Sequence, residues 1–332
     1  MTVDAETPLV TLDAIRAAAA TLRGVATRTP LVPFGRPDAG RFLKAESLQP
    51  IGAFKIRGAY VAVAALSPDE RARGVITYSS GNHAQGVARA ARLFGIAAVI
   101  VMPSDAPALK KARVEADGAE VVVVGTSSEE RKVVAEQIAA ERGLAIIPPF
   151  DDDRIIAGQG TVGLEIAEDV PDVAAVLVPI GGGGLASGVC VAVRALVPGA
   201  RLIGVEPELA ADAQQSLRQG RIVRWSPRDA SRTIADGTRT TAIGRRNFAH
   251  LSRLLDDVVT VSESEIGAAV RLAAEQSRLV AEPSGALPVA ALAFRAREAG
   301  LDGLTGPIVA IVSGGNVDPE QYRHLLASPL PG

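Results

Sequence analysis

The feature that most constrains this chain is a repeated alternation of short aliphatic, β-branched runs with stretches of helical periodicity, beginning near residue 75. The runs read as buried strands: "VITYSS", "AAVIVM", "EVVVVG", "AAVLVPI", "RLIGVE", "DVVTVS" and "PIVAIVS". Helical stretches follow the first four of them, near residues 84–94, 106–116, 128–143 and 185–196. Strands that alternate with helices of this length form βαβ units. The pattern therefore predicts an α/β protein with open, twisted, mostly parallel sheets.

The alternation is densest in two regions, residues 75–147 and 174–317, which "PPFDDDR" separates. We expect two domains, because 332 residues can form more than one substantial core. A small domain, residues 56–147, is predicted to be inserted into a large domain made of residues 1–55 and 148–332.

Composition argues against several functions. A net charge of -2 and an aromatic content of 3% offer neither the basic field nor the stacking surfaces that nucleic-acid binding uses. No apolar run approaches the roughly 20 residues that span a bilayer, and the acidic N-terminus does not resemble a secretory signal. The single cysteine, Cys190, fits a reducing compartment and a place in the core. We expect a cytoplasmic protein that binds neither nucleic acid nor membranes.

One lysine has an unusual setting. In "IGAFKIRGAY", residues 51–60, Lys55 lies among apolar neighbours at the expected start of a helix. A helix N-terminus carries positive partial charge and mildly disfavours a cation. Taken alone, the stretch favours an ordinary lysine whose ammonium reaches water, so a special role for Lys55 has to come from the rest of the chain.

The second notable motif is a glycine loop. "VLVPIGGGGLASG" passes from an expected strand through Gly181, Gly182, Gly183 and Gly184 into an expected helix. Converging backbone N–H groups and a helix N-terminus bind anions, most simply a phosphate. The stretch also fits a dinucleotide fingerprint, since Gly181, Gly183 and Ala186 are followed after about 20 residues by Glu206. An NAD-dependent dehydrogenase is therefore an alternative at this point.

A second loop, "TYSSGNHAQG", residues 77–86, also joins an expected strand to an expected helix. Ser79, Ser80, Gly81 and Asn82 offer more hydrogen-bonding groups than a plain helix cap requires, and such a cluster can hold a carboxylate. Ser313 follows the last buried strand, and ligands in open α/β sheets bind beyond the carboxyl ends of strands.

A lysine, a phosphate cradle, a carboxylate cradle and a lone hydroxyl at strand ends match one cofactor. Pyridoxal 5′-phosphate is held by a lysine as a Schiff base, and its ring nitrogen needs a partner. A dehydrogenase would leave Lys55 and the second loop without a role. The residues therefore favour pyridoxal 5′-phosphate.

At this point the sequence resembles the fold-type II pyridoxal-phosphate enzymes, in the branch of threonine/serine dehydratases and serine racemases. The resemblance covers nearly the whole chain, and its pieces are "KAESLQPIGAFKIRGA", "SSGNHAQG", "PFDDDRIIAGQGT", "PIGGGGLASG", "TIADG" and "AEPSGA". It implies a tryptophan synthase beta-like fold with the cofactor between the large and small domains.

The resemblance also implies roles for individual residues. Lys55 matches the Schiff-base lysine, and Ser80 matches an acid–base group on the opposite face of the substrate. The implied cofactor-binding residues are Phe54, Lys55, Asn82, Gly181, Gly182, Gly183, Gly184, Leu185 and Ser313. The implied substrate-binding residues are Ser79, Ser80, Gly81, Asn82 and His83. Ala53 departs from the family's usual serine, which puts the fine substrate preference in doubt.

The implied activity is β-elimination of L-threonine or L-serine to a 2-keto acid and ammonia. Serine racemase and 3-hydroxyaspartate dehydratase activity are alternatives within the family, and Arg239 could meet a second substrate carboxylate, although a surface role is the better interpretation. The resemblance further implies a homodimer and a Mg²⁺ or Ca²⁺ site at Glu206, the carbonyl of Ala210, and Asp212. Because the chain ends soon after Asn316, we expect no C-terminal regulatory domain, and hence a catabolic role.

Overall fold

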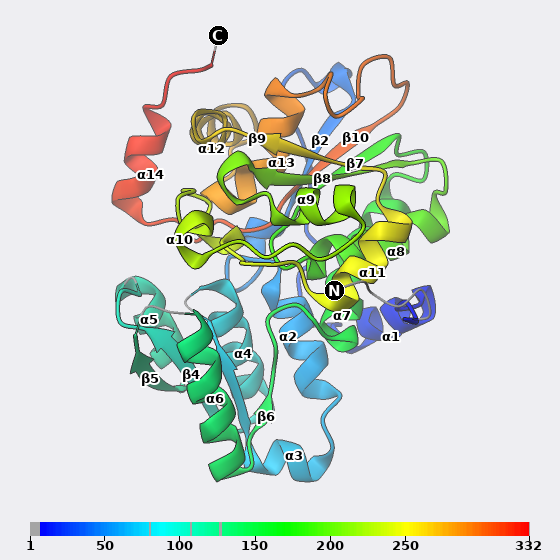
Figure 1. Cartoon of the computed structure of the whole chain (residues 1–332). Helices are drawn as coiled ribbons and strands as arrows, with labels where there is room; N and C mark the ends of the chain where they lie inside the picture. Colours follow the sequence, from blue (N-terminus) through cyan, green and yellow to red (C-terminus); the bar gives the residue numbers. More distant parts are fainter. Residues whose placement is uncertain (1–6, 80, 107, 126–127, 332) are drawn as a thin grey trace.

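The computed structural model describes residues 7–79, 81–106, 108–125 and 128–331. Its larger sheet has six strands in the order β1-β2-β10-β7-β8-β9 (Figure 1). β1 is antiparallel to β2, and every other neighbouring pair in this sheet is parallel. The strands are β1 (Leu31–Pro33), β2 (Arg41–Ala45), β7 (Ala175–Pro179), β8 (Arg201–Pro207), β9 (Asp257–Val261) and β10 (Ile308–Val312).

The smaller sheet has four parallel strands in the order β5-β4-β3-β6. All of them come from one continuous part of the chain, whereas strands of the larger sheet precede and follow it, as an inserted domain requires. Figure 1 shows this sheet with α4, α5 and α6 in the lower half of the molecule. The limits of the two domains stay a prediction. The strands are β3 (Val75–Tyr78), β4 (Ala98–Pro103), β5 (Glu120–Val124) and β6 (Ala145–Ile146).

Helices fill the connections, as the alternation predicts. The α-helices are α1 (Leu12–Thr21), α2 (Lys55–Ala64), α3 (Pro68–Arg73), α4 (Asn82–Phe94), α5 (Ala108–Ala116), α6 (Ser128–Arg142), α7 (Asp153–Asp169), α8 (Gly184–Leu196), α9 (Asp212–Gln219), α10 (Pro227–Ala230), α11 (Arg245–Leu254), α12 (Glu263–Ser277), α13 (Pro283–Phe294) and α14 (Pro319–Leu326). Short 3-10 turns are η1 (Pro37–Ala39), η2 (Glu46–Leu48), η3 (Glu208–Ala210) and η4 (Asp236–Thr238).

The larger sheet is buried on both faces. In β10, Ile308, Ala310 and Val312 pack into the core that contains α12 and α13. The alternate residues, Val309 and Ile311, pack into the core that contains α8 and α11. Side chains of a strand point to opposite faces in turn, so burial on both faces makes the whole strand apolar. This is why the strands appear in the sequence as uninterrupted aliphatic runs.

Close backbone packing by α7 links the helices around the site. A Cβ on Gly158 would lie 2.6 Å from the Cα of Gly58 in α2. On the same helix, Gly160 lies close to Gly188 of α8, since a Cβ on Gly188 would be 2.5 Å from the backbone nitrogen of Gly160. Glycines permit such approaches because they have no side chain. α7 therefore sets the spacing between the helix that starts at Lys55 and the helix that follows the glycine loop.

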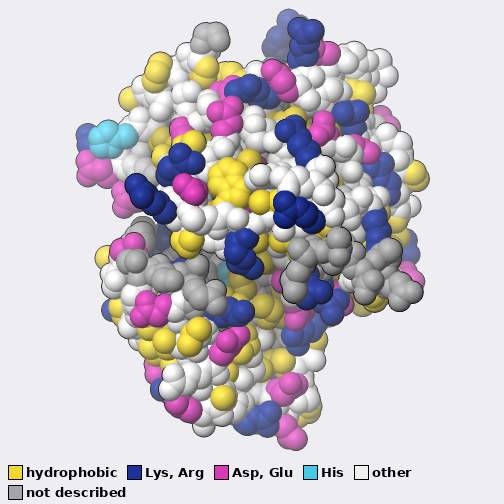
Figure 2. Space-filling model, viewed as in Figure 1, with side chains coloured by type: hydrophobic (Ala, Val, Ile, Leu, Met, Phe, Trp, Pro, Cys, Tyr) yellow, Lys and Arg dark blue, Asp and Glu magenta, His cyan; other side chains and the backbone are white. Residues whose placement is uncertain are grey.

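Three further features of the structure concern its helices, its surface charge and its single cysteine. None of the helices in the described ranges has the length and apolar character needed to cross a membrane. Figure 2 shows cationic and anionic side chains interspersed over the face that it draws. Cys190 is fully buried in α8, as expected for a small core residue, and burial raises the pKa of its thiol.

Candidate active site

Lys55 is the first residue of α2, as the sequence predicts. Its Nζ donates a hydrogen bond to the carbonyl oxygen of Pro149, at 2.8 Å, and lies 5.1 Å from the ring centroid of Phe54. Burial lowers the pKa of Lys55 to about 8, since the charged form loses its hydration. A minority of the amine is therefore already neutral near neutral pH, and the neutral share rises steeply at mildly alkaline pH.

Lys55 also differs from every other lysine in the chain. The sequence contains five lysines, all within the described residues. Four of them form ion pairs with carboxylates, at distances between 2.5 and 3.8 Å: Lys44, Lys110, Lys111 and Lys132. Among the described residues, no carboxylate pairs with Lys55. An unpaired, partly buried amine of lowered pKa is suited to nucleophilic and general-base chemistry.

The glycine loop lies close to Lys55 through one shared segment. A Cβ on Gly182 would lie no more than 2.5 Å from three ring carbons of Phe150. The residue before Phe150 is Pro149, whose carbonyl accepts the hydrogen bond from Lys55. Gly183, the N-cap of α8, has a φ of 96°, a conformation that favours glycine. Leu185 is buried in the first turn of α8.

Ser313 follows β10 directly and lies beside the start of α2. Its carbonyl oxygen accepts a hydrogen bond of 3.0 Å from the backbone N–H of Phe54. An isolated antiparallel bridge joins Ala53 to Gly314. Two segments far apart in the sequence are thus side by side, with Ser313 next to Phe54 and Lys55. Ala53 is fully buried, so the hydroxyl usual in the family is replaced by a methyl group in a closed setting.

The amide of Asn82 is held from both ends. Its Nδ2 donates to Glu282 Oε1 at 2.6 Å, and its Oδ1 accepts from Asn316 Nδ2 at 2.8 Å. One N–H of Asn82 stays available for a ligand, because an amide nitrogen has two. Burial, together with the charge of Asp236, raises the pKa of Glu282 to about 7. The sequence analysis gave Glu282 no role, although "AEPSGA" contains it.

The second loop has the features that an anion site requires. The N-cap of α4 is Gly81, which has no side chain to cap the first helical amides, and its own N–H is bonded to Ser79 Oγ at 3.3 Å. His83 Nε2 donates to the carbonyl of Ile147 at 3.0 Å. Burial and the nearby Lys55 amine lower the pKa of His83 to about 3, so the imidazole is neutral. Ser80 lies outside the described residues.

Three helices converge on this region, and none has a side-chain cap. They are α2, α4 and α8, whose N-caps are Phe54, Gly81 and Gly183. Other helices of the fold have side-chain caps, such as α1, α3, α7, α12 and α14. Uncapped amides and the positive end of a helix are stabilised by an anion. The site therefore fits a cofactor that carries a phosphate and a substrate that carries a carboxylate.

The three predicted metal ligands are near one another. Glu206, at the end of β8, accepts hydrogen bonds from the backbone N–H groups of Ala213 and Gln214, at 3.1 and 2.7 Å. Asp212 is the first residue of α9. Both carboxyls are buried, which raises their pKa values, that of Asp212 to about 7. Ala210 is buried in η3.

Both oxygens of Asp212 lack a hydrogen-bond partner within the described residues. Buried carboxylate oxygens without partners are costly, and a bound cation would satisfy them. The described residues contain no group of three or more His, Cys, Asp or Glu side chains that could hold a metal. A cation here would need backbone or water oxygens as well.

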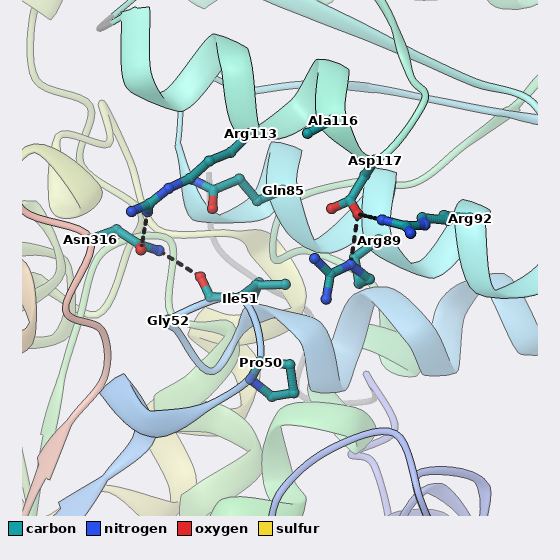
Figure 3. A pocket seen from close by; sticks show the side chains of 10 residues that line it. All are labelled: Pro50, Ile51, Gly52, Gln85, Arg89, Arg92, Arg113, Ala116, Asp117 and Asn316. Atoms are coloured by element: carbon teal, nitrogen blue, oxygen red, sulfur yellow. Dashed lines mark hydrogen bonds and ion pairs between the residues drawn. The ribbon is translucent and has the colours of Figure 1, made fainter.

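Asn316, whose amide donates to Asn82, also lines a cavity of about 380 Å³ (Figure 3). Arg113 points into it and donates to Asn316 Oδ1 at 2.5 Å, while Asp117 accepts hydrogen bonds from Arg89 and Arg92. The other lining residues are Pro50, Ile51, Gly52, Gln85 and Ala116. Lys55 is not among them, so the cavity is separate from the lysine although Asn316 contacts Asn82.

Two further observations concern residues around the site. Lys110 of α5 forms an ion pair of 2.5 Å with Asp236 of η4, which joins the small-sheet unit to the large one. No local sequence signal predicted this pair.

Arg239 is exposed, and its Nε and Nη2 donate to the carbonyl of Thr233, at 2.9 and 2.6 Å. This arrangement agrees with the surface interpretation of Arg239.

The fold and the site together fit an α/β enzyme that binds a phosphorylated cofactor beside a lysine of lowered pKa. The family model of pyridoxal-phosphate-dependent enzymes matches residues 22–314. The L-threo-3-hydroxyaspartate ammonia-lyase of Saccharomyces cerevisiae is 44% identical over 298 residues, which cover 90% of this chain and 89% of that protein. The serine racemase of Schizosaccharomyces pombe is 40% identical, with coverage of 96% and 98%. The solved structure of maize serine racemase has a TM-score of 0.89 and 38% identity, and the match covers 96% of this chain and 98% of that one.

The chain therefore belongs to the pyridoxal-phosphate-dependent enzymes, in the fold-type II branch of threonine/serine dehydratases and serine racemases. The family and the fold are as predicted, and pyridoxal phosphate is the cofactor. The dehydrogenase alternative loses its support, because the family model and the similar enzymes use pyridoxal phosphate, and the buried carboxyl of Glu206 accepts hydrogen bonds from two backbone N–H groups. The roles of individual site residues remain predictions.

Proposed function

We propose that this protein is an ammonia-lyase that converts a small β-hydroxy amino acid, L-threonine or L-serine, into a 2-keto acid and ammonia. The observation that carries the proposal is Lys55, the lysine with no carboxylate partner in the described structure, whose amine has a lowered pKa and lies near the glycine loop. The names of similar enzymes, L-threonine ammonia-lyase and hydroxyaspartate ammonia-lyase among them, support the same reaction class.

Bound pyridoxal phosphate supplies an electron sink that acidifies the α proton of an attached amino acid. Lys55 Nζ would hold the aldehyde carbon of the cofactor, and the backbone amides of residues 181–184 would hold its phosphate. Asn82 would bind the ring oxygen and Ser313 would face the ring nitrogen. The hydroxyl of Ser313 does not force a proton onto that nitrogen as a carboxylate would, which favours elimination over transamination.

Proton transfer is assigned to Lys55. With a pKa of about 8, Nζ is neutral in enough molecules at neutral to mildly alkaline pH to accept the α proton of the substrate. The uncapped first turn of α4, with Ser79 and Gly81, would bind the substrate carboxylate. Ser80 would exchange a proton on the opposite face, which is the route to racemisation.

The proposal is tested by measuring keto acid released from a panel of amino acids by the cofactor-loaded enzyme without nicotinamide. We expect product from L-threonine or L-serine, and none from a Lys55→Ala variant. Release of keto acid from none of the panel would overturn the proposal. L-threo-3-hydroxyaspartate belongs in the panel because the similar yeast enzyme is named for it. D-serine and a racemisation assay cover the remaining alternative.

We further propose that Mg²⁺ or Ca²⁺ binds between Glu206, the carbonyl of Ala210, and Asp212. The two partnerless oxygens of Asp212 support a hard cation, which takes carboxylate, carbonyl and water oxygens. Chelation should lower the melting temperature and the activity, and either ion should restore them. Asp212→Ala should mimic chelation, whereas Asp302→Ala, at an exposed position, should not. An unchanged melting temperature after exhaustive chelation would contradict the site.

The quaternary state, the compartment and the domain limits complete the proposal. We propose that the protein is a homodimer, because its family resemblance implies one. We also propose a large domain of residues 1–55 and 148–332 and a small domain of residues 56–147, because the chain forms two separate sheets. A cytoplasmic location is in keeping with the single cysteine. Sedimentation analysis of the purified protein tests the dimer, and a mass of one chain would refute it.

A further inference from the structure

Two residues beyond Lys55, a buried cluster of charges fixes the same helical turn. Lys44, Glu46, Arg57 and Glu165 are 0%, 0%, 1% and 9% exposed. Burial of an ionised group is strongly unfavourable unless it is paired and hydrogen-bonded. The cluster meets this requirement with two positive and two negative groups, which is neutral overall.

Arg57 is the centre of the cluster. Its Nε and Nη2 donate to the two oxygens of Glu46, both at 2.8 Å, and its Nη1 and Nη2 donate to the two oxygens of Glu165, at 2.6 and 3.0 Å. Nη1 also reaches Thr161 Oγ1 and Nη2 the carbonyl of Thr27, each at 3.1 Å. Each nitrogen of the planar guanidinium thus faces an acceptor, an arrangement that a lysine cannot reproduce.

The partners of Arg57 belong to rigid parts of the large sheet and its helices. Glu46 lies in η2, directly after β2, and also accepts a hydrogen bond of 2.6 Å from Thr29 Oγ1. Glu165 lies in α7 and pairs with Lys44 of β2 at 2.7 Å. The motif "KAESLQPIGAFKIRGA" supplies Lys44, Glu46 and Arg57 together with Lys55, and of these four only Lys55 is expected to contact the cofactor.

The turn that carries Lys55 needs such an anchor. Phe54, the N-cap of α2, provides no side-chain hydrogen bond, and helix ends without a cap fray. Arg57 is the third residue of the helix, so its side chain ties the first turn to β2 and α7. On its other side this turn meets α4, where a Cβ on Gly86 would lie 3.1 Å from the carbonyl oxygen of Lys55.

We propose that Arg57 is a positioning residue for Lys55. Clamped by Glu46 and Glu165, it fixes the first turn of α2 and with it the direction of the Lys55 amine. The proposal rests on the assignment of Lys55 as the cofactor lysine. Net stability alone does not explain the cluster, because replacing a buried ion pair with apolar residues often leaves a fold as stable as before.

The test compares Arg57→Lys with Val270→Ala, a variant of a fully buried residue in α12 that has no part in the charge cluster. Arg57→Lys retains the positive charge but cannot form the paired hydrogen bonds to both Glu46 and Glu165. We expect a kcat about 10–100-fold lower with KM changed little, because a misplaced base slows proton transfer more than substrate binding. We also expect faster hydrogen exchange at the amides of residues 56–59 in the cofactor-free protein. Val270→Ala should lower the melting temperature without either effect.

Thr161→Val is a milder second variant, because it keeps the charge while it removes one acceptor of Arg57, together with the hydrogen bond of 2.6 Å that Thr161 Oγ1 donates to the carbonyl of Gly158. Should Arg57→Lys fail to fold, Thr161→Val decides, with kcat expected at least about threefold lower and hydrogen exchange at the amides of residues 56–59 expected to be faster. If the folded variants keep the kcat of the wild type and its hydrogen-exchange rates at the amides of residues 56–59, the proposal is overturned. The exchange measurement needs no cofactor, so it distinguishes this failure from a wrong assignment of Lys55.

Discussion

Gly182→Ala should disturb cofactor binding by a steric route that can be followed through the structure. The added methyl carbon would lie no more than 2.5 Å from three ring carbons of Phe150. Carbon atoms in contact need about 3.5–4.0 Å, so the ring would have to retreat by at least about 1 Å. Phe150 is not free to do so without moving its neighbours, because its carbonyl lies 3.1 Å from a Cβ position on Gly184 and Pro149 accepts the hydrogen bond from Lys55.

The magnitude follows from ordinary overpacking, which costs about 1–3 kcal/mol. With an unfolding entropy of about 2.1 cal/mol/K per residue, 332 residues give about 0.7 kcal/mol/K, so the melting temperature should fall by about 1.5–4 °C. The displaced segment, Pro149 and Phe150, contacts both the glycine loop and Lys55. We therefore also expect weaker cofactor binding and a kcat/KM at least about tenfold lower.

The matched control is Gly199→Ala, because a Cβ at Gly199 meets no atom within 4 Å. Thermal unfolding of the cofactor-free proteins and titration with pyridoxal phosphate provide the assays. If Gly182→Ala melts and binds the cofactor as Gly199→Ala does, the proposed contact between Phe150 and the glycine loop is refuted.

Three shorter predictions concern single residues, of which the one for Ser80 rests on the family resemblance. Lys55→Ala should lower turnover by more than about a thousandfold while the protein keeps its melting temperature, since covalent and base roles are lost together; retained turnover would contradict the assignment. Ser80→Ala should impair racemisation or D-serine turnover far more than L-threonine or L-serine elimination, whereas equal losses would limit Ser80 to binding. His250 Nε2 accepts from the N–H of Val10, and burial lowers the pKa of His250, so its neutral form belongs to the folded state. Stability should therefore fall as the pH drops below about 6.5, and urea unfolding at several pH values should show a weaker dependence in His250→Gln.

The strands could be predicted because their signals are local. A strand buried on both faces appears as a continuous aliphatic run, and β10 and β7 follow that rule. Helix starts were less certain: α4 and α8 begin slightly before the predicted points, at Asn82 and Gly184, because glycine N-caps leave no polar signal at the boundary. The glycine loop indicated an anion site because few structural needs explain four successive glycines, whereas Lys55 gained a predicted role only together with the other motifs.

The polar contacts around the site could not be predicted in the same way. Glu282 is separated from Asn82 by 200 residues, and nothing periodic in the sequence marks such a pair. The same holds for Lys110 with Asp236, and for Arg57 with Glu165. Such pairs depend on tertiary contacts between elements that close only in the folded chain. The sequence therefore indicated candidate reactive residues, while the structure shows which contacts surround them.

The central claim is that Lys55 is the residue to which pyridoxal phosphate attaches. Borohydride reduction fixes the cofactor covalently onto its lysine, and peptide mass spectrometry then identifies the modified residue. The chain has only five lysines, so the result is unambiguous. We predict the phosphopyridoxyl group on the peptide that contains Lys55, with loss of the visible absorption band. Modification of Lys44, Lys110, Lys111 or Lys132 instead, or of no lysine at all, would contradict the account.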